Sequence, residues 1–182
     1  MKKNLLLATL LAAGVTGQVF AADVNISLNG GVIDTTCLVN GAAAGTAAAV
    51  TVTMPKLSKA QVAANALGPV MRSSASTLNL TSCPTTSKVG LVFDAGTNWN
   101  FTSLGIKNTL AASAGGSQGV DVQLLDANNA VINANNTAST TYVTPAADGS
   151  ATYTFGTQYV RNSETPASGT YTSTVNAWLV YQ

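Results

Sequence analysis

The chain has 182 residues with 8 basic and 7 acidic side chains, so its formal net charge is only +1. It has no basic patch that could hold a phosphate backbone, which argues against nucleic-acid binding. It contains no histidine, which removes the usual general base, the Ser-His-Asp triad and most zinc sites.

The first 21 residues have the pattern of a secretory signal peptide. Lys2 and Lys3 form a positive start, and residues 5–15 form an apolar stretch that is too short to span a bilayer. Val19 and Ala21 place permitted side chains before the expected cleavage point. We therefore expect an exported chain that is cleaved after Ala21, and we expect no membrane span in the rest of the sequence.

The remaining residues make up one domain's worth of chain, with strand patterns and almost no helical periodicity. Residues 23–39 alternate as an extended segment, and residues 41–49 are a loop rich in alanine and glycine. Residues 56–66 permit a short helix, which Gly68 and Pro69 end. Further strands are predicted at residues 50–54, 76–83, 89–93, 99–106, 119–126, 130–132, 140–143 and 150–160 and in the tail. This pattern predicts an all-β sandwich of immunoglobulin type.

The tail, residues 169–182, is predicted to be a final strand with nothing after it to pair with. The tail side chains that share one face are Val175, Ala177, Leu179 and Tyr181. Near the other end of the chain, a second alternating set also lacks an evident partner: Val24, Ile26, Leu28, Gly30 and Val32. An edge that lacks a strand and a strand that lacks an edge suggest a protein that polymerises.

The two cysteines, Cys37 and Cys83, are predicted to form one structural disulfide in an exported chain. They do not have the Cys-x-x-Cys spacing of a redox-active pair. The bridge would close a loop for which the chain-entropy model gives on the order of 4 kcal/mol of stabilisation.

Reactive groups are few and scattered, and we expect no catalytic residue, no cofactor and no metal ion. Trp99 and Trp178 could stack on a sugar, but packing against the core, a neighbouring element or another subunit explains them better. A glycosidase-like carboxylate pair is a weaker alternative. The carboxylates occur singly, mostly at predicted turns and strand ends, at Asp23, Asp34, Asp94, Asp121, Asp126, Asp148 and Glu164.

Together, several features resemble the pilin subunits of chaperone–usher fimbriae, the type 1 fimbrial major pilin family. They are the leader, Leu28-x-Gly30 with Cys37 seven residues later, the segments 78–83 and 119–126, and the ending with Gly169 and Tyr181. The resemblance covers nearly the whole mature chain. It implies an incomplete immunoglobulin-like sandwich that lacks its final strand and is completed by donor-strand exchange.

The resemblance also implies three parts of the chain: a signal peptide (1–21), a donor-strand extension (22–34) and a pilin domain (35–182). The donor side chains would be Val24, Ile26, Leu28, Gly30 and Val32. The acceptor strand, which would also bind the chaperone, would use Gly169, Val175, Ala177, Leu179, Tyr181 and Gln182. The implied partners are a periplasmic pilus chaperone, an outer-membrane usher and further copies of the chain. The implied product is a fimbrium on the bacterial surface, reached through the periplasm and used in cell adhesion.

Two alternatives stay open. Within the same family, the chain could be a minor or adaptor subunit. Outside it, a monomeric secreted carbohydrate-binding β-sandwich would have a sugar site near Trp99 or Trp178, and it would not depend on residues 24–30.

Overall fold

The computed structural model describes residues 36–42, 48–72, 75–134, 136 and 140–182. The chain divides into two compact units, Met1–Val32 and Ile33–Gln182, and the described residues all belong to the second. The predicted signal peptide (1–21) and donor extension (22–34) therefore lie outside the described residues. No helix among the described residues is long and apolar enough to cross a membrane.

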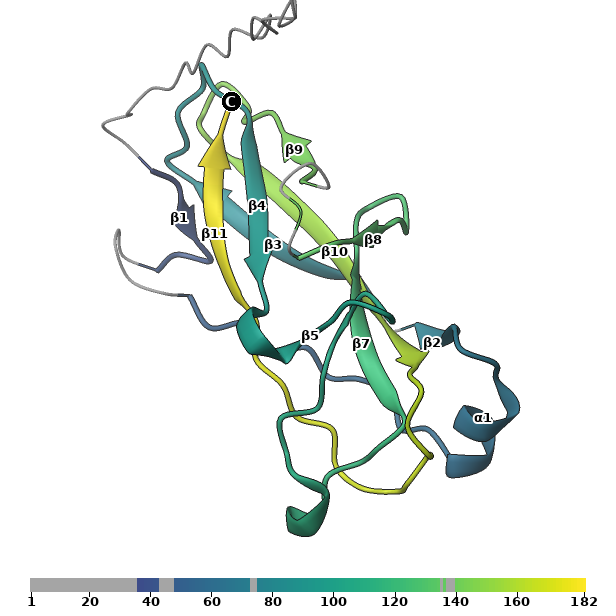
Figure 1. The fold of residues 1–182 in the computed structure, drawn as a ribbon. Coiled ribbons are helices and arrows are strands. Elements are labelled where there is room, and N and C mark those ends of the chain that lie inside the picture. The colour runs from purple at the N-terminus through teal and green to yellow at the C-terminus, as the bar shows by residue number, and fades with distance from the viewer. Residues whose placement is uncertain (1–35, 43–47, 73–74, 135, 137–139) are drawn as a thin grey trace, which may run out of the picture. The chain divides into compact units, whose positions relative to one another are not determined.

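The described residues form two antiparallel sheets (Figure 1). The main path of the larger sheet is β1 (Leu38–Val39), β3 (Ser76–Thr81), β10 (Ala151–Arg161), β7 (Val120–Leu125), β6 (Gly105–Ile106) and β5 (Trp99–Asn100). In the same sheet, β2 (Pro69–Arg72) pairs with β10 and β8 (Val131–Ile132) pairs with β7. The smaller sheet has the order β11 (Asn176–Tyr181), β4 (Val89–Asp94), β9 (Tyr142–Val143). The helices are α1 (Lys59–Ala64) and the 3-10 turns η1 (Gly96–Asn98) and η2 (Ala112–Ala114).

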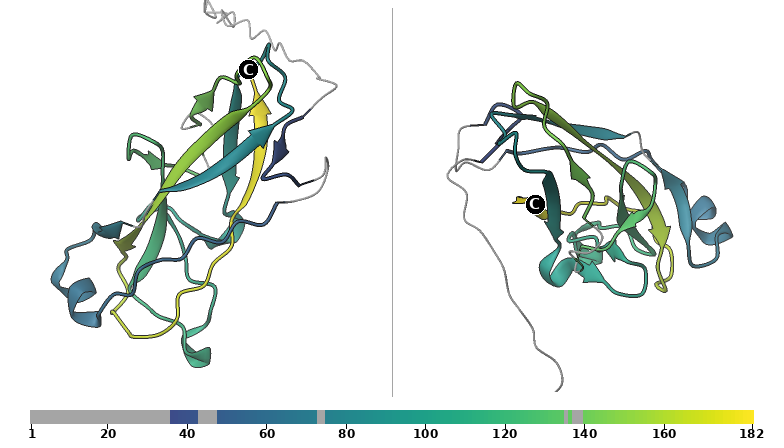
Figure 2. Two further views of the ribbon diagram at one scale, coloured as in Figure 1. Left: turned by 180° about the vertical axis from the view of Figure 1, so that it is seen from behind. Right: turned by 90° about the horizontal axis from the view of Figure 1, so that it is seen from above.

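The main hydrophobic core lies between the two sheets, and Figure 2 shows β3 and β10 in a different layer from β4. Alternate side chains of each strand point into this core because successive residues of a strand face opposite sides. Phe93 of β4 meets Phe155 of β10 with the ring centroids 5.9 Å apart. The core side chains of these strands are Val89, Leu91 and Phe93 on β4, Leu78 and Leu80 on β3, and Tyr153 and Phe155 on β10.

A second, smaller cluster lies where α1 packs against β7 and the C-terminal part of β10 in the larger sheet. Val62, the buried residue of α1, joins Val120, Val122 and Tyr159 in this cluster. The helix begins with a capping box, in which the Ser58 side chain accepts a hydrogen bond from the backbone N–H of Gln61 at 3.1 Å and the Gln61 side chain accepts one from the backbone N–H of Ser58 at 2.9 Å. The short helix predicted within residues 56–66 is confirmed.

The strand predicted at residues 50–54 is wrong. This segment pairs with no strand among the described residues, although Val52 and Met54 pack against the two clusters. Its alternation therefore reflects side chains that cover the core, while its backbone takes no place in a ladder. A sequence pattern reports which side chains are buried, but pairing also needs a partner strand at the correct distance.

The single strand predicted at residues 99–106 is also wrong, because this segment is a hairpin of β5 and β6. The Asn100 side chain causes the reversal by accepting a hydrogen bond from the backbone N–H of Thr102 at 3.0 Å. Leu104 completes the turn at a φ of 50°, a left-handed conformation that is unusual for leucine.

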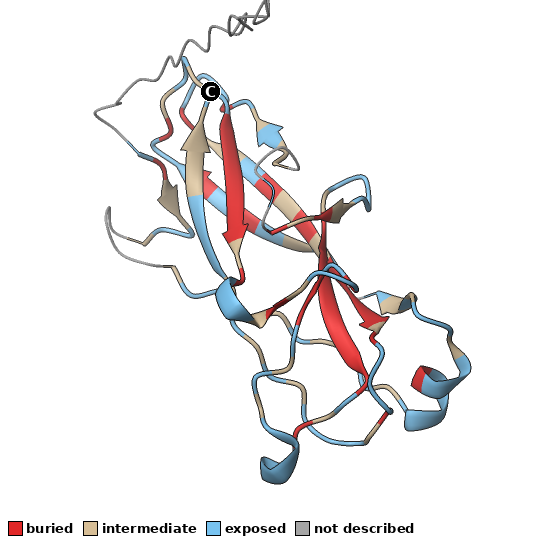
Figure 3. Cartoon of the chain, in the orientation of Figure 1, coloured by how far each residue is buried: buried red, intermediate tan, exposed pale blue. Residues whose placement is uncertain are grey.

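The centre of the larger sheet, β7, is buried on both faces, as the red colouring in Figure 3 shows. Val120, Val122 and Leu124 occupy its apolar face. Asp121 on the opposite face is 1% exposed and accepts hydrogen bonds from three neutral side chains. These donors are Ser103 Oγ at 2.6 Å, Asn100 Nδ2 at 2.7 Å and Asn162 Nδ2 at 3.0 Å. The β5–β6 hairpin and Asn162 therefore supply a polar cover for this face of β7.

We expect Asp121→Ala to lower the free energy of unfolding by about 3 kcal/mol, because it leaves the buried donors of Ser103 and Asn162 and the half-buried donor of Asn100 without their acceptor. Asp148→Ala is the control, since Asp148 lies in an exposed turn, and it should cost much less. Urea titration of both variants measures the difference. Equal losses would show that the Asp121 network contributes no more to stability than the hydrogen bonds of an exposed turn.

Tyr171, at the start of the tail, is held in the second cluster. Its hydroxyl donates to the Ile106 carbonyl at 2.6 Å, and its ring meets Tyr159 edge-on at 5.8 Å. Burial, reinforced by the negative charge of Asp121, raises the pKa of Tyr171 far above its ordinary value. Burial also raises the pKa of Tyr159. Both phenols are therefore held in their neutral form.

We expect stability to fall as the pH rises above about 10, the ordinary pKa of tyrosine. The neutral phenols contribute their full stability below that pH, and the contribution is lost as the pH climbs toward their raised folded-state pKa values. Unfolding curves between pH 8 and 12 measure this loss. Tyr171→Phe should make the alkaline decline shallower, and an unchanged decline would assign it to other groups.

Candidate functional site

The candidate site is the outer edge of β11, the last strand of the chain. β11 pairs with β4 in a continuous antiparallel register from Asn176↔Asp94 to Tyr181↔Val89. Gln182 extends the pairing by exchanging backbone hydrogen bonds with Lys88 at 2.8 and 3.0 Å. Among the described residues, β4 is the only strand that pairs with β11. An edge strand of this kind presents backbone donors and acceptors that can pair with a further strand.

The inner face of β11 closes one side of the main core incompletely. Leu179 and Tyr181, together with Val175 just before the strand, pack against the core but are only half-buried. Ala177, which lies between them on the same face, is exposed. On the opposite face Trp178 is 49% exposed. This edge therefore offers partly covered apolar side chains beside the backbone of β11.

The neighbouring edge belongs to the other sheet. β1 pairs with β3 through Leu38↔Thr81 and Val39↔Leu80. β1 lies beside β11 in Figures 1 and 2, and no pairing joins these two strands among the described residues. Val39 on β1 and Val52 after it are half-buried against the same core as Leu179. Two strand edges and a row of half-covered apolar side chains thus meet on one side of the sandwich.

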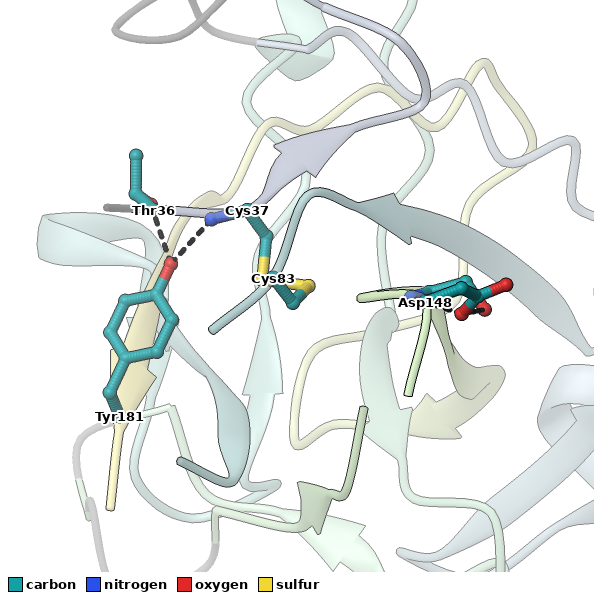
Figure 4. The surroundings of a disulfide bond; sticks show 6 residues. Thr36, Cys37, Cys83, Asp148 and Tyr181 are labelled. Atoms are coloured by element: carbon teal, nitrogen blue, oxygen red, sulfur yellow. Dashed lines mark hydrogen bonds between the residues drawn. A yellow bond between two sulfur atoms is a disulfide. The ribbon is translucent and has the colours of Figure 1, made fainter. Parts of the chain in front are cut away.

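The predicted disulfide between Cys37 and Cys83 is confirmed, and it fixes β1 to this edge (Figure 4). The two Cα atoms lie 4.2 Å apart, at the end where β1 begins and just after β3 ends. Both cysteines are buried in the main core. The bridge therefore holds the first described residues of the chain against β3, next to the end of β11.

A hydroxyl of the last strand also reaches this point. The backbone N–H of Cys37 donates to Tyr181 Oη at 2.9 Å, and the hydroxyls of Tyr181 and Thr36 hydrogen-bond to each other (Figure 4). The sequence placed Tyr181 on the core-facing side of the tail but gave no signal for this contact. The partners are separated by 144 and 145 residues, so only the folded chain brings them together.

The strand predicted over the whole tail is shorter in the structure, where β11 begins at Asn176. Gly169 lies before it, where the tail crosses residues 115–117. A Cβ atom at Gly169 would lie 2.5 Å from backbone atoms of Gly116 and Ser117, so no side chain fits there. Gly169 therefore serves the close passage of two backbone segments, and the tail then runs on toward β11.

The carboxylates of this sandwich have local structural partners. Asp94, Asp126 and Asp148 each accept backbone N–H bonds within their own turns. The hydrogen bonds from the Ser150 hydroxyl and backbone lower the pKa of Asp148. No group of three potential metal ligands occurs in the described part of the chain. Trp99 is 2% exposed in the core, so its ring is not available to stack on a sugar.

We expect Cys37→Ser to lower the free energy of unfolding by a few kcal/mol, up to about 4 kcal/mol, because the bridge spans a long loop. The variant should also bind a strand at the β11 edge less well, since β1 is no longer fixed beside it. Urea titration with and without reductant measures the first effect. Reductant should weaken the wild-type chain and leave Cys37→Ser unchanged, and equal sensitivity of the two would contradict this account.

Comparisons with known proteins agree with this fold. A family model described as fimbrial protein matches residues 26–182. The F17 fimbrial protein of Escherichia coli is 30% identical over 190 residues, covering 100% of both chains. A chaperone–usher pilus structure that addresses rod uncoiling has a TM-score of 0.55 at 19% identity, covering 87% of this chain and 94% of that one.

The crystal structure of the P pilus rod subunit PapA has a TM-score of 0.52 at 19% identity, covering 87% of this chain and 100% of that one. At this level of identity the two pilus structures establish the fold, while the family model and the F17 relative establish the family. Fimbrial proteins are structural subunits of surface pili and not enzymes. The chain belongs to the fimbrial protein family and has the incomplete immunoglobulin-like fold of a chaperone–usher pilus subunit.

Proposed function

We propose that this chain polymerises into a surface fibre by donor-strand exchange, in which residues 22–34 of one copy pair with the β11 edge of the next. The observation that carries the proposal is the edge itself. β11 pairs on one side with β4, and its other side faces β1 without a pairing between them among the described residues. Strand addition at such an edge obtains affinity from backbone hydrogen bonds and register from alternate side chains.

The sequence of the extension has the alternation that this edge would accept. Val24, Ile26 and Leu28 fall on one face and would pack against the half-buried side chains around Leu179 and Tyr181. Each large apolar side chain that becomes buried contributes about 1.5–3 kcal/mol. Gly30 would pass a crowded position where a side chain would clash, and Val32 would continue the same face.

An open edge beside a half-covered core is also an aggregation hazard. Before assembly we propose that a periplasmic chaperone lends a strand to the β11 edge. The outer-membrane usher would then exchange that strand for the extension of the incoming copy. The signal peptide (1–21) would direct the chain to the periplasm, and the finished fibre would act in cell adhesion.

The other candidates make separate predictions. A minor or adaptor subunit would form a small fraction of an isolated fibre, so the share of this chain among the fibre subunits separates it from a rod subunit. In the sugar-binding alternative, Trp99 cannot stack on a sugar because it is buried. Of the two tryptophans, only Trp178 is exposed enough to form such a site.

The test moves residues 22–34 from the N-terminus to a short linker after Gln182. We expect a soluble monomer that no longer polymerises and whose free energy of unfolding rises by about 5 kcal/mol or more, since three large apolar side chains become buried. The matched control is the same graft with Leu28→Asp, which keeps the backbone but places a charge against the core. It should lose most of the gain.

Size-exclusion chromatography and urea titration measure the two expectations. A grafted chain that is no more stable than the ungrafted one would refute the proposal. So would a Leu28→Asp graft that keeps the full gain, because the alternate side chains would then play no part in recognition.

A further inference from the structure

The contact between Tyr181 and the residues just before β1 joins two functionally different parts of the chain. Tyr181 is the last residue of β11, the proposed acceptor strand. Thr36 and Cys37 follow almost directly after residues 22–34, the proposed donor strand. One side chain thus links the end of the acceptor strand to the root of the donor extension of the same copy (Figure 4).

Both sides of this contact are held by the rest of the fold. Cys37 is fixed by the disulfide to Cys83, and the next residue, Leu38, pairs with Thr81. Tyr181 pairs with Val89, and its ring packs against the main core. The hydroxyl therefore connects two well-anchored points, and Thr36 is the first described residue of the chain.

The chemistry of a phenol suits this connection. A tyrosine hydroxyl accepts one hydrogen bond and donates another, so it can bond the Cys37 N–H and the Thr36 hydroxyl at once. Thr36 is exposed, and water could satisfy its hydroxyl equally well. The Thr36 hydroxyl therefore does not need Tyr181 to satisfy its hydrogen-bonding capacity. The effect of the two bonds is to restrict the backbone position of Thr36 and Cys37.

We propose that Tyr181 is a positioning residue that sets the direction in which the donor extension of its own copy starts. This inference rests on the proposed function. The Tyr181 hydroxyl holds Thr36 and Cys37 beside the end of β11, and these two residues carry the extension that enters the next copy. The start of each extension then has a fixed orientation relative to the acceptor strand of the same copy. This restricts the angle between neighbouring copies and stiffens the fibre.

The test compares fibres of the full chain with those of Tyr181→Phe, which keeps the ring and removes both hydrogen bonds. Thr36→Val is a second variant that removes one partner and leaves the Cys37 bond. Tyr142→Phe is the control, since Tyr142 is an exposed tyrosine on β9 of the same sheet. Two quantities are measured on each fibre: amide hydrogen exchange at Cys37, and persistence length by electron microscopy.

In Tyr181→Phe fibres we expect Cys37 to exchange at least about tenfold faster, because it loses its hydrogen-bond acceptor, and we expect a shorter persistence length than in wild-type fibres. Thr36→Val should keep Cys37 protected and give an intermediate persistence length. Tyr142→Phe should match the wild type in both. Thr36→Val leaves the Cys37 amide protected and keeps the Tyr181 ring. A shorter persistence length in this variant would therefore report the direction of the extension, and neither the protection of one amide nor the packing of the ring would explain it.

Tyr181→Phe fibres with wild-type exchange and wild-type persistence length would overturn the inference while leaving strand exchange intact. Failure of the wild-type chain to form fibres in the same electron micrographs would instead overturn the proposed function, and the inference with it. If Tyr181→Phe forms no fibres, Thr36→Val decides: a reduced persistence length supports the inference, and a wild-type value overturns it.

Discussion

The architecture depends on β11, a strand that is paired on one side only among the residues that the structure describes. β11 receives its full ladder from β4, yet its other backbone edge and the apolar side chains beside it lie at the margin of the core. A sandwich closed by a further strand would bury Leu179 and Tyr181 more completely. Here these side chains stay half-buried. The same side chains that pack against the core would therefore also contact an added strand in the proposed assembly.

The other conspicuous features of the fold place and hold this edge. The Cys37–Cys83 bridge holds β1 on the neighbouring sheet. Gly169 lets the tail pass close to residues 115–117, and Tyr171 anchors it in the second cluster before β11 begins. The tail is therefore held at these points before it pairs with β4. At the end of β11, the Tyr181 hydroxyl accepts a hydrogen bond from the backbone N–H of Cys37. Among the described carboxylates, Asp94, Asp126 and Asp148 stabilise turns and Asp121 is the centre of a buried network.

Local periodicity predicted much of this, because alternation is a property of neighbouring residues. It located the long strands β3, β4, β7, β10 and β11, the helix near Ser58, and the core-facing side of the tail. It failed at residues 50–54, whose side chains cover the core without a strand partner. It also failed at residues 99–106, where one asparagine reverses the chain. Partner choice is non-local, and a single-sequence pattern does not contain it.

The same limit applies to the candidate site. The set from Val175 to Tyr181 was visible as a face, but the contacts of the Tyr181 hydroxyl and the participation of Val39 and Val52 depend on how distant segments meet. The buried position of Asp121 was likewise hidden, since its polar cover comes from the β5–β6 hairpin and from Asn162. Sequence reasoning found the strand that lacks a neighbour and missed what surrounds it.

The central claim is that the β11 edge of one copy is completed by the N-terminal strand of another. Solid-state NMR of fibres assembled from a mixture of two differently isotope-labelled copies tests it directly. The account predicts contacts from Ile26 and Leu28 of one labelled copy to Leu179 of the other. Contacts between these residues only within the same copy, or none at all, would contradict it.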